Sequence, residues 1–401
     1  MKKPVRRRVL MLLENNPYQF DQRPKREARA LVRAGYRVSV ISPLPPGGNV
    51  QEVVDGIHFY QFPPPPAANG FLGYLWEYAY ATGVISVLSL VVLLREGFDI
   101  LHAHNPPDTF FLIAAFYKLL GKRFVYDHHD LAPEMYYYAR FRTGGNRLVY
   151  QILGLLEKLT CRIADLVLAT NESYKAVEME RSKVPEERVT VVRNGPDLDS
   201  LHPADPDPEL GLRASTILCY VGRISPQDGL DYLLRALSHL VYDLDRSDVL
   251  CVVIGDGDAL SEAKTQASEL QIEEHVWFVG WVSDPALIRR YLATADIGVD
   301  PAPSNPYNDR CTMVKMMEYM ALEKPIVAFD LPEHRVTAQD AAAYARPNDE
   351  FDFAQQIASL MDDPKRRREM GQTGRGRIEK ELAWPHQEKH LLEAYKALSA
   401  G

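Results

Sequence analysis

"CTMVKMMEYMALEKPIVAFD", residues Cys311 to Asp330, contains a predicted helix followed directly by a predicted strand. Almost every side chain from Met313 to Leu322 is apolar, which predicts a helix buried over most of its surface. The run "PIVAF" that follows is short and continuously apolar, as is typical of a strand covered on both faces. A helix leading into such a strand is the repeating unit of an α/β fold with a parallel sheet.

The same alternation of strands and helices runs through both halves of the chain. The predicted strands are "RRVLMLL", "YRVSVIS", "FDILHAH", "RFVYD" and "ADLVLAT" in the first half, and "TILCYVG", "VLCVVIG", "VWFVG", "ADIGVD" and "PIVAF" in the second. Between the halves, residues 194–211 are rich in Pro, Asp and Gly and have no periodicity, which is typical of a linker. A chain of 401 residues also exceeds one ordinary core.

The predicted fold class is therefore α/β, with two Rossmann-like domains built on parallel sheets. We expect a first domain over residues 1–196, a linker over 197–212 and a second domain over 213–383. The last helix, 384–401, follows a Trp-Pro break and is expected to pack back on the first domain.

Charge is unevenly distributed between the halves. Residues 1–196 hold 25 Lys plus Arg and 19 Asp plus Glu, a net +6, and the remaining 21 and 35 give −14, which sums to the formal −8. A basic first half indicates an anionic partner such as a membrane surface or a phosphorylated substrate. No motif combining aromatic and basic residues accompanies it, so we expect no nucleic-acid partner. The four cysteines form no CxxC pair, which favours reduced, buried thiols in a cytoplasmic protein.

Polar residues follow the predicted strands, at the sheet edge where α/β proteins bind ligands. The first half offers His104 and Asn105, the run "DHHD" at 127–130, and Asn171. The second half offers Gly222 and Arg223, "GDGD" at 255–258, Asp300 and the loop "SNPYNDRCT". His102, deeper in its strand, is expected to be a core histidine. Imidazoles gather on one edge, and glycines and cations on the other, which predicts one composite site.

Lys315 is the unusual residue of the opening stretch. It lies in the first turn of the predicted helix, where the helix dipole disfavours a cation. A bound diphosphate would explain it, since Thr312 is a predicted N-cap and the free N–H groups of a helix start attract anions. Glu318, three residues on, would then accept hydrogen bonds from a ribose diol. The alternative is an exposed ion pair between the two side chains.

Taken together, "YVGRISPQDGLDYLLRAL", "VVIGDGD", "VWFVGWV", "NDRCTMVKMMEYMALEKPIVAFD", "LHAHNPPD" and "VYDHHDLAPE" resemble the family 4 glycosyltransferases of the retaining class, with the GT-B fold. The resemblance covers nearly the whole chain and is closest to a bacterial branch that assembles surface polysaccharides and O-antigen repeats. It implies transfer of a hexose from a nucleotide-diphosphate sugar such as a UDP-sugar, with retention of anomeric configuration, no cofactor and no bound metal. The implied acceptor is a glycan or a polyprenyl-diphosphate-linked sugar.

The resemblance also assigns residues. Arg223 matches a phosphate-binding arginine, Glu318 the ribose-binding glutamate, and His129 the histidine beside the transferred sugar, with His128 as the next candidate. The remaining donor-binding assignments are Gly222, Gly257, Val279 and Gly280, together with the backbone amides of Thr312, Met313 and Val314; His104 and Asn105 are candidates on the acceptor side.

Two positions depart from the family pattern. Asp228 stands where the family has a phosphate-binding lysine, and Arg310 replaces the first glutamate of a paired-glutamate motif. We expect Lys315 to supply the missing cation and Asp309 to stand in for the missing carboxylate. Fixed cations and helix N–H groups aimed at the leaving diphosphate would then stabilise the transition state without a metal. No carboxylate pair flanks the sugar site, so we expect no double displacement.

Three other motifs have structural alternatives. "DPD" at 205–207 and "DGD" at 256–258 fit a DxD metal motif, but a linker and a phosphate-binding loop are the favoured interpretations. "DHHD" could ligate zinc, although adjacent side chains of an extended segment diverge. Residues 78–94 are 17 uncharged residues, near the lower limit for spanning a bilayer. We favour a buried or interfacial helix, with the protein peripheral on the inner face of the plasma membrane.

Two rival functions remain open. A nonhydrolysing nucleotide-sugar epimerase shares two facing Rossmann-like domains and would isomerise the donor without an acceptor. A non-catalytic nucleotide-sugar-binding module is suggested by the two departures, and it would bind the donor without releasing a nucleoside diphosphate.

Overall fold

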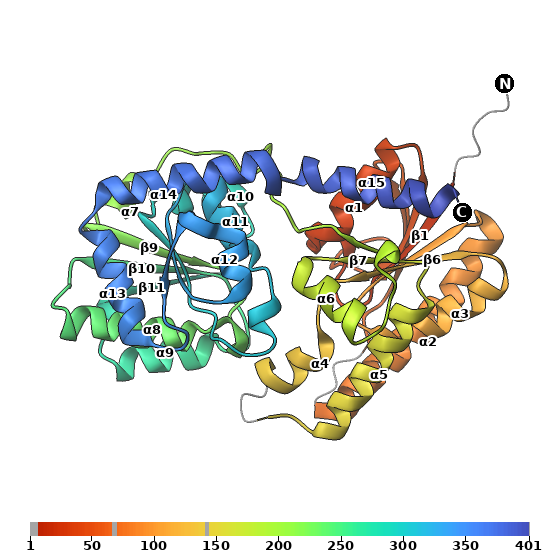
Figure 1. The fold of residues 1–401 in the computed structure, drawn as a ribbon, viewed down its shortest axis with the longest axis horizontal. Helices are drawn as coiled ribbons and strands as arrows, with labels where there is room; N and C mark the ends of the chain where they lie inside the picture. The colour runs from red at the N-terminus through yellow and green to blue at the C-terminus, as the bar shows by residue number, and fades with distance from the viewer. Residues whose placement is uncertain (1–6, 66–69, 141–143, 401) are drawn as a thin grey trace. The chain divides into compact units, whose positions relative to one another are not determined.

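Apolar strands of the first half assemble into an eight-stranded sheet with the order β3-β4-β2-β1-β5-β6-β7-β8. The structure is a computed structural model, and it describes residues 7–65, 70–140 and 144–400 (Figure 1). The strands are β1 (Arg8–Leu12), β2 (Arg37–Pro43), β3 (Gln51–Val54), β4 (Ile57–Phe62), β5 (Ile100–His104), β6 (Arg123–His128), β7 (Leu166–Ala169) and β8 (Val189–Val191). All neighbouring pairs are parallel except β3 and β4, so the expectation of a purely parallel sheet is wrong at this edge.

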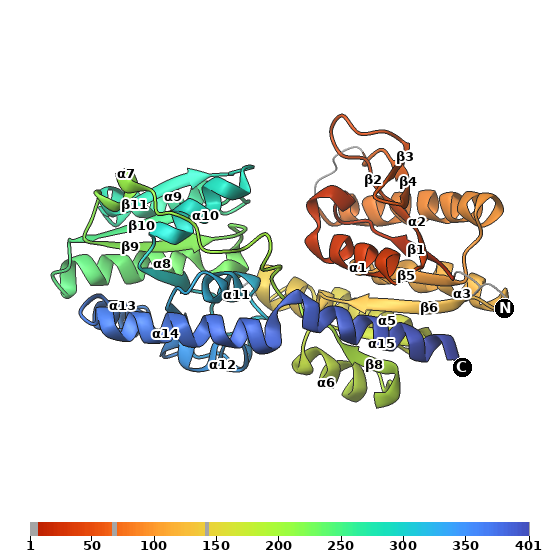
Figure 2. The same ribbon diagram turned by 90° about the horizontal axis from the view of Figure 1, so that it is seen from above.

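Helices cover both faces of this sheet. They are α1 (Gln22–Arg33), α2 (Gly70–Arg95), α3 (Phe111–Leu119), α5 (Arg147–Ile163), α6 (Glu172–Glu180) and the end of α15 (Trp384–Ala400). Helices α2, α3 and α5 lie on one face, and α1 and α15 on the other (Figures 1 and 2). Tyr395 of α15 is fully buried and bonds His102 Nδ1 of β5 at 2.7 Å. His102 is therefore a core residue, tied to the C-terminal helix.

The second half forms a six-stranded parallel sheet with the order β11-β10-β9-β12-β13-β14. Its strands are β9 (Thr216–Val221), β10 (Val249–Ile254), β11 (Val276–Gly280), β12 (Ile297–Asp300), β13 (Ile326–Phe329) and β14 (Ala342–Ala345). Its helices are α7 (Pro208–Gly211), α8 (Leu230–Ser238), α9 (Leu260–Glu269), α10 (Pro285–Thr294), α11 (Val314–Ala321), α12 (Pro332–Ala338), α13 (Glu350–Met361) and α14 (Pro364–Arg377). Two apolar clusters fill the space on the two sides of the strands.

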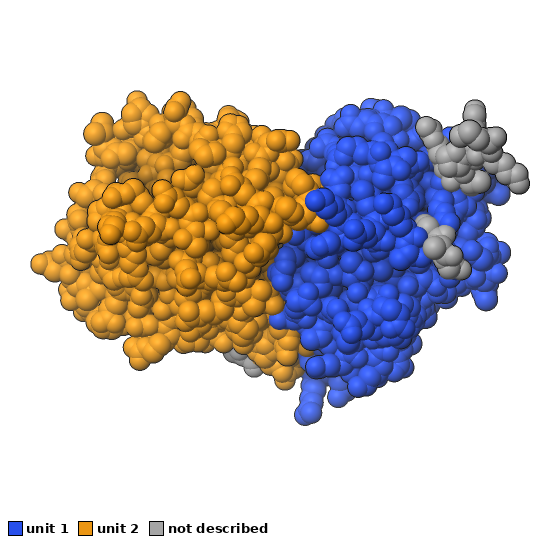
Figure 3. Space-filling model, turned by 45° about the horizontal axis from the view of Figure 1, so that its top comes forward, with its two compact units in different colours: residues 1–133, 146–193, 387–401 blue, residues 134–145, 194–386 orange. Residues whose placement is uncertain are grey.

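The chain divides into two compact units (Figure 3). Unit 1 comprises Met1–Pro133, Asn146–Arg193 and Gln387–Gly401, and unit 2 comprises Glu134–Gly145 and Asn194–His386. Unit 2 thus includes a segment from the first half, which contains the short π-helical turn Met135–Arg140. The C-terminal residues from Gln387 onward belong to unit 1, and Glu388 pairs there with Arg33 of α1 at 2.6 Å.

One described helix is long and apolar enough to cross a membrane. It is the part of α2 from Trp76 to Arg95, with a mean hydropathy of 1.7. A stripe of this helix, residues Ala81, Ile85, Ser89 and Val92, is fully buried against unit 1. The other sides of the helix carry half-buried and exposed side chains, so α2 lies along the surface of its own unit.

Candidate functional site

Glycine loops follow the first two strands of unit 2 at the carboxyl edge of its sheet. Gly222 follows β9 with φ +143°, and Gly255 follows β10 with φ +145°, a backbone conformation that side chains rarely adopt. The two loops touch, since a Cβ on Gly255 would lie 1.8 Å from the Gly222 carbonyl oxygen, and one on Gly257 would lie 2.1 Å from that of Ile224. Close packing of the two loop backbones therefore leaves no room for a side chain at positions 255 and 257.

Lys315 projects from α11 into this edge and is almost completely buried. A Cβ on Gly222 would lie 3.3 Å from Lys315 Cε, so the lysine stem crosses directly beside the glycine loop. Its Nζ lies 3.6 Å from Asp300 Oδ1 and 3.7 Å from Asp228 Oδ1, and 4.5 Å from the centre of the Tyr220 ring. Burial lowers the pKa of Lys315, but Tyr220, Asp300 and Asp228 more than offset it, so the pKa is raised and the ammonium stays charged.

The opening pair of charges is therefore not an exposed ion pair. Lys315 faces the sheet edge, and Glu318, one turn further along α11, is half-buried. The partners of Lys315 come from β9, β12 and the loop after β9, which lie far away in sequence. The carboxylates of Asp228 and Asp300 lie close to the Lys315 ammonium. They offset the unfavourable interaction of this cation with the positive end of the helix dipole.

Asp228 has a local structural role in addition to its contact with Lys315. Its carboxylate accepts a hydrogen bond from the Ser225 backbone N–H, and the two residues form a reciprocal capping box around the turn Pro226–Asp228. Burial raises the pKa of Asp228, and Lys315 partly offsets that rise. The position that the resemblance assigns to a lysine thus holds an acid whose charge is met by Lys315.

Arg223 is the exposed cation of this edge. Its Nε donates to Ser225 Oγ at 3.2 Å, and Ser225 Oγ donates in turn to Asp258 Oδ1 at 2.7 Å. The last Asp of the "DGD" motif therefore supports the arginine loop. In "DPD", Asp207 caps α7 by accepting from the Glu209 and Leu210 N–H groups. Both DxD motifs have structural roles within unit 2.

The start of α11 differs from the sequence prediction. The N-cap residue is Met313, with no side-chain cap, so the assignment of Thr312 as N-cap is wrong. Thr312 Oγ1 instead donates to the buried Glu333 Oε2 at 3.3 Å. The helix begins at Val314, one residue later than predicted. Because no side chain caps this start, backbone N–H groups there remain suited to an anion.

The loop before α11 holds the residues around the second departure. Arg310 Nη1 donates to the Pro306 carbonyl at 2.6 Å, and Asp309 Oδ1 accepts from Ser304 Oγ at 2.9 Å. Both side chains are half-buried within their own loop. At the other end of this edge, Gly280 has φ +83°, and its carbonyl accepts from Gly255 N–H at 3.0 Å. Val279 and Gly280 thus adjoin the glycine loops.

In unit 1, Asn105 organises the edge that carries His129. Its Oδ1 accepts from the backbone N–H groups of His129 and Asp130 at 2.8 and 3.1 Å, and its Nδ2 donates to the Asp130 carbonyl at 2.6 Å. Burial lowers the pKa of His129 to about 3, so its imidazole is neutral at physiological pH. Its Nε2 has no hydrogen-bond partner among the described residues. A neutral imidazole whose Nε2 is buried without a partner in the described part of the chain is a candidate hydrogen-bonding group for a ligand hydroxyl.

His128 points in a different direction and is fully buried. Its Nδ1 lies 2.9 Å from Glu178 Oε1 and its Nε2 3.6 Å from Glu157 Oε2. Burial lowers the pKa of His128, but the two carboxylates raise it by more than burial lowers it. The pKa is therefore well above the ordinary value. This geometry makes His128 part of an internal charge network and removes it from the surface at which an acceptor would bind.

His104 is also internal. Its Nδ1 lies 2.9 Å from Asp127 Oδ2, and Asp127 is held on its other oxygen by Arg23 Nη2 at 2.6 Å. Glu27 Oε2 lies 3.9 Å from His104 Nε2 and 3.5 Å from His102 Nε2. Arg23 and Glu27 were not singled out from the sequence, because a helix with many charges gives no signal for buried ones.

The side chains of Glu27, His102, His104 and Asp127 are close enough to hold a metal ion. However, Arg23 already neutralises Asp127, and its Nε lies 3.3 Å from Glu27 Oε1. Burial raises the pKa of Glu27 to about 8, so a proton neutralises this carboxylate near neutral pH. The charges of the cluster are thus balanced by its own groups. The "DHHD" run itself diverges, with Asp127, His128 and His129 in three different environments.

Glu14 is a carboxyl group at this edge that sequence reasoning missed. It follows β1 by two residues, and its side chain is buried. Burial, followed by repulsion from Glu77, raises its pKa to about 8. Strongly shifted carboxyls at the carboxyl edge of an α/β sheet are candidates for functional groups.

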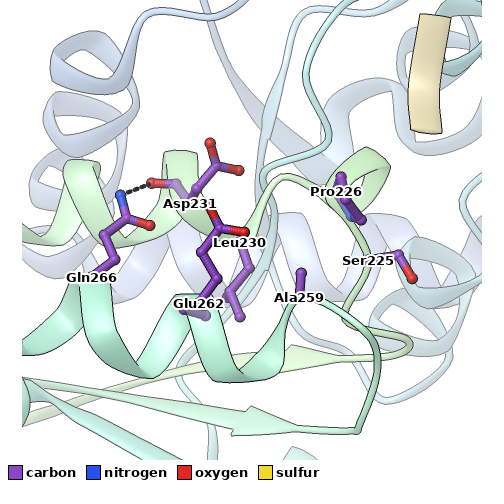
Figure 4. A pocket seen from close by; sticks show the side chains of 8 residues that line it. Ser225, Pro226, Leu230, Asp231, Ala259, Glu262 and Gln266 are labelled. Atoms are coloured by element: carbon purple, nitrogen blue, oxygen red, sulfur yellow. Dashed lines mark hydrogen bonds between the residues drawn. The ribbon is translucent and has the colours of Figure 1, made fainter. Parts of the chain in front are cut away.

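A small pocket of about 220 Å³ lies elsewhere in unit 2 (Figure 4). It is lined by residues of α8, α9 and the preceding loops, where Gln266 Nε2 donates to the Asp231 carbonyl at 3.3 Å. It shares Ser225 and Pro226 with the sheet edge, and it contains none of the predicted site residues. The glycine loops and Lys315, rather than this pocket, are therefore the candidate site of unit 2.

Two family descriptions match successive parts of the chain. "Glycosyltransferase Family 4" matches residues 25–200, and "Glycosyl transferases group 1" matches residues 208–377. The alpha-maltose-1-phosphate synthase of Mycolicibacterium smegmatis is 30% identical over 305 residues, which cover 70% of this chain and 75% of the relative. The UDP-Gal:alpha-D-GlcNAc-diphosphoundecaprenol alpha-1,3-galactosyltransferase of Escherichia coli is 27% identical over 227 residues, about half of each chain (54% and 55%).

Solved structures share the fold across both units. The sucrose-phosphate synthase from Thermosynechococcus elongatus superposes with a TM-score of 0.81 at 18% identity, covering 98% of this chain and 100% of that one. Anabaena HepE, solved in complex with UDP-glucose, gives a TM-score of 0.69 at 16% identity, covering 97% and 99%.

Proposed function

Because the chain belongs to the family 4 glycosyltransferases, which have the GT-B fold, we propose that it transfers a hexose from a nucleotide-diphosphate sugar with retention of anomeric configuration. The acceptor is a glycan or a polyprenyl-diphosphate-linked sugar, and the reaction uses neither a cofactor nor a bound metal. The observation that carries the proposal is the lysine enclosed beside the Gly222 loop, at the carboxyl edge where α/β sheets bind ligands.

The donor diphosphate binds at this edge of unit 2. Gly222 and Gly257 allow close approach of the backbone, Arg223 provides the exposed cation, and the N–H groups at the start of α11 face the phosphates. Lys315 replaces the lysine that is missing at position 228, since its Nζ lies 3.7 Å from the Asp228 carboxylate. Glu318 binds the ribose diol, Asp309 a sugar hydroxyl, and Val279 and Gly280 contact the base.

The chemistry is charge stabilisation on the leaving group. The bond between C1 of the sugar and the diphosphate oxygen breaks, and a bond from C1 to the acceptor oxygen forms on the same face. The acceptor proton passes to an oxygen of the departing diphosphate. Arg223 and the ammonium of Lys315 stabilise the charge that develops there. His129, neutral at physiological pH, positions a sugar hydroxyl and does not act as a nucleophile.

A UDP-sugar is the preferred donor, and surface-polysaccharide assembly is the proposed pathway. The donor is supported by two similar proteins: HepE was solved with UDP-glucose, and the Escherichia coli relative is named for a UDP-galactose donor and a diphosphoundecaprenol-linked acceptor. A lipid-linked acceptor would be met by a cytoplasmic protein that is peripheral on the inner face of the plasma membrane, and this is the proposed location.

A thermal-shift screen of UDP, GDP, ADP and CDP sugars tests the donor first, because a ligand that binds only the folded chain raises its melting temperature. The stabilising donor is then incubated with membrane-lipid extract with and without EDTA. We expect acceptor-dependent release of the nucleoside diphosphate, unaffected by EDTA, and an α-linked product from an α-linked donor by NMR. Isomerised donor without acceptor would indicate an epimerase, and binding without release would indicate a non-catalytic module.

A further inference from the structure

Three helices of unit 1 expose large apolar side chains in regular stripes. The spacing within each stripe is three or four residues, so each stripe runs along one side of its helix. The exposed residues are Val87, Leu90 and Leu94 of α2; Leu112, Phe116 and Leu119 of α3, with Leu120 just after it; and Leu148, Ile152 and Leu155 of α5. We call these ten residues the apolar face.

The ten residues point away from the sheet on one side of unit 1. In each helix the buried residues lie on the opposite side: Ser89 and Val92 in α2, Tyr117 in α3 and Thr160 in α5 are buried. Helices α3 and α5 pack against each other, and α2 lies on the same sheet face (Figures 1 and 2). Tyr117 Oη donates to Ser89 Oγ at 2.8 Å, which joins α3 to α2. The stripes therefore combine into one surface rather than scattered exposed side chains.

The exposed charges of the three helices are positive, and at their border Asp165, just after α5, pairs with Lys118 at 2.8 Å and with Arg123 at 3.6 Å. The three helices carry five cations, of which Arg95, Arg147 and Arg162 are exposed and Lys118 and Lys158 half-buried. They carry two carboxylates: Glu157 is fully buried, and Glu77 lies near the start of α2, close to Glu14. Arg123, just beyond α3, is also exposed. An apolar surface with basic side chains among and around it is complementary to an anionic lipid bilayer.

The geometry of α2 favours binding along the membrane plane over crossing it. A helix that crosses a bilayer is surrounded by lipid unless other spanning helices cover it. In contrast, α2 buries Ser89 against the Tyr117 hydroxyl, and it buries Ala81 and Ile85 against its own unit. Pulling α2 out of unit 1 would expose that core stripe. The helix can therefore contribute its outer side alone.

We propose that the apolar face of α2, α3 and α5 is the surface by which this protein binds an anionic membrane peripherally. The inference deepens the proposed function, on which it rests only for the reason to bind a membrane, namely a lipid-linked acceptor. Leu94, Phe116 and Leu119 enter the acyl boundary, while Arg95 and Arg147 meet anionic headgroups.

The test is co-sedimentation of the full chain with vesicles, without donor or acceptor. Vesicles contain phosphatidylcholine alone or with about 30% phosphatidylglycerol. The test variant combines Leu94→Ser with Leu119→Ser, because these side chains are 85% and 88% exposed and contribute little to the core. The matched control is Leu212→Ser, equally exposed at 88% but in unit 2. Circular dichroism melting verifies that all three chains fold alike.

We expect the wild type to bind the anionic vesicles. High salt and carbonate should each release it. Loss of both leucines should weaken binding by about tenfold or more, and Leu212→Ser should change nothing. Four outcomes would overturn the proposal: no vesicle binding, equal binding to neutral vesicles, equal loss in the control, or binding that survives carbonate. A dimer that the double variant dissociates, without vesicle binding, would assign the face to a second copy instead. Donor stabilisation and product release are measured separately, so failure here leaves the proposed function intact.

Discussion

The ammonium of Lys315 lies between two carboxylates, and removing it isolates them in a buried site. Lys315→Met is therefore expected to lower the free energy of unfolding by roughly 3–5 kcal/mol, as for other broken buried ion pairs. Adding Asp300→Asn removes the fully buried partner and should restore most of that loss in urea unfolding.

The double variant separates structure from function. If Lys315 contacts the donor diphosphate, Lys315→Met with Asp300→Asn binds the preferred nucleoside diphosphate about tenfold or more weakly than the wild type, the size of a lost charge-assisted hydrogen bond. Affinity equal to that of the wild type in the restored double variant would show that Lys315 serves only the fold.

Glu14 gives a pH dependence of stability. Its pKa is about 8 in the folded chain, above the ordinary 4.5, so the folded state holds a proton that the unfolded state has lost between these values. Stability from this group is complete below about pH 4.5 and is lost as pH rises through 8. Glu14→Gln should therefore be more stable than the wild type at pH 8 by roughly 4 kcal/mol, with a flatter profile from pH 5.

Urea unfolding at pH 5, 6, 7 and 8 measures this difference. Glu274→Gln is the control, because that carboxylate is exposed and its removal should leave the profile as in the wild type. Parallel stability profiles for the wild type and Glu14→Gln would contradict a raised pKa of Glu14 in the folded chain.

At the scale of single residues, the sequence located the edge but not its internal partners. Positions after apolar strands, such as Gly222, Gly257 and Arg223, follow from the rule that ligands bind at carboxyl ends of parallel strands. The surroundings of Lys315 did not follow, because Tyr220, Asp228 and Asp300 are brought to it by tertiary folding alone. His128 and His129 lie in different surroundings because adjacent side chains of an extended segment point to opposite sides.

Among the elements, the β3–β4 hairpin was missed although its turn is visible in the sequence. Asp55 and Gly56 have φ of 53° and 78°, as the two central residues of a tight hairpin turn require, and Asp-Gly between extended runs is a strong hairpin signal. Strand β14 gave no such signal, because its residues "AAYA" lack β-branched side chains. The start of α11 was placed one residue early because helix ends are set by local backbone geometry.

The contact between the glycine loops predicts an asymmetry between two glycine substitutions in unit 2. Gly255→Ala should lower the free energy of unfolding by about 2 kcal/mol or more, because its Cβ would overlap a backbone oxygen and φ is +145°. Gly376→Ala, in α14 with open space around it, should raise the free energy of unfolding by about 0.5–1 kcal/mol. Equal effects in chemical unfolding would contradict the packing of the two loops.

A buried hydrogen bond between Tyr395 and His102 joins the C-terminal helix to the core of unit 1. Tyr395→Phe keeps the ring but leaves His102 Nδ1 without its partner, and should cost about 1–3 kcal/mol in urea unfolding. Tyr242→Phe is the comparison, since Tyr242 is largely exposed and also bonds a neighbour through its hydroxyl. A cost for Tyr395→Phe no larger than for Tyr242→Phe would mean that the bond contributes little.

For the whole molecule, the two α/β halves followed from alternating apolar strands and helices, since burial on both faces of a sheet imposes that pattern, whereas the GT-B fold was implied by the resemblance to family 4 glycosyltransferases. The apolar face of unit 1 was less visible. Residues 78–94 indicated one apolar helix, but neither α3 nor α5 could be placed beside it without the topology. Which apolar side chains of the three helices stay exposed depends on how the helices pack on the sheet.

Unit 2 is expected to bind the diphosphate of the donor at the edge formed by Gly222, Arg223 and the start of α11. Calorimetric titration of the full chain with UDP, GDP, ADP and CDP tests this expectation most directly, using Arg223→Ala and, as a control, the exposed Arg346→Ala. One of the four diphosphates should bind the wild type, Arg223→Ala should weaken that binding about tenfold or more, and Arg346→Ala should leave the affinity unchanged. Absence of binding by all four, or unchanged affinity in Arg223→Ala, would contradict the expectation.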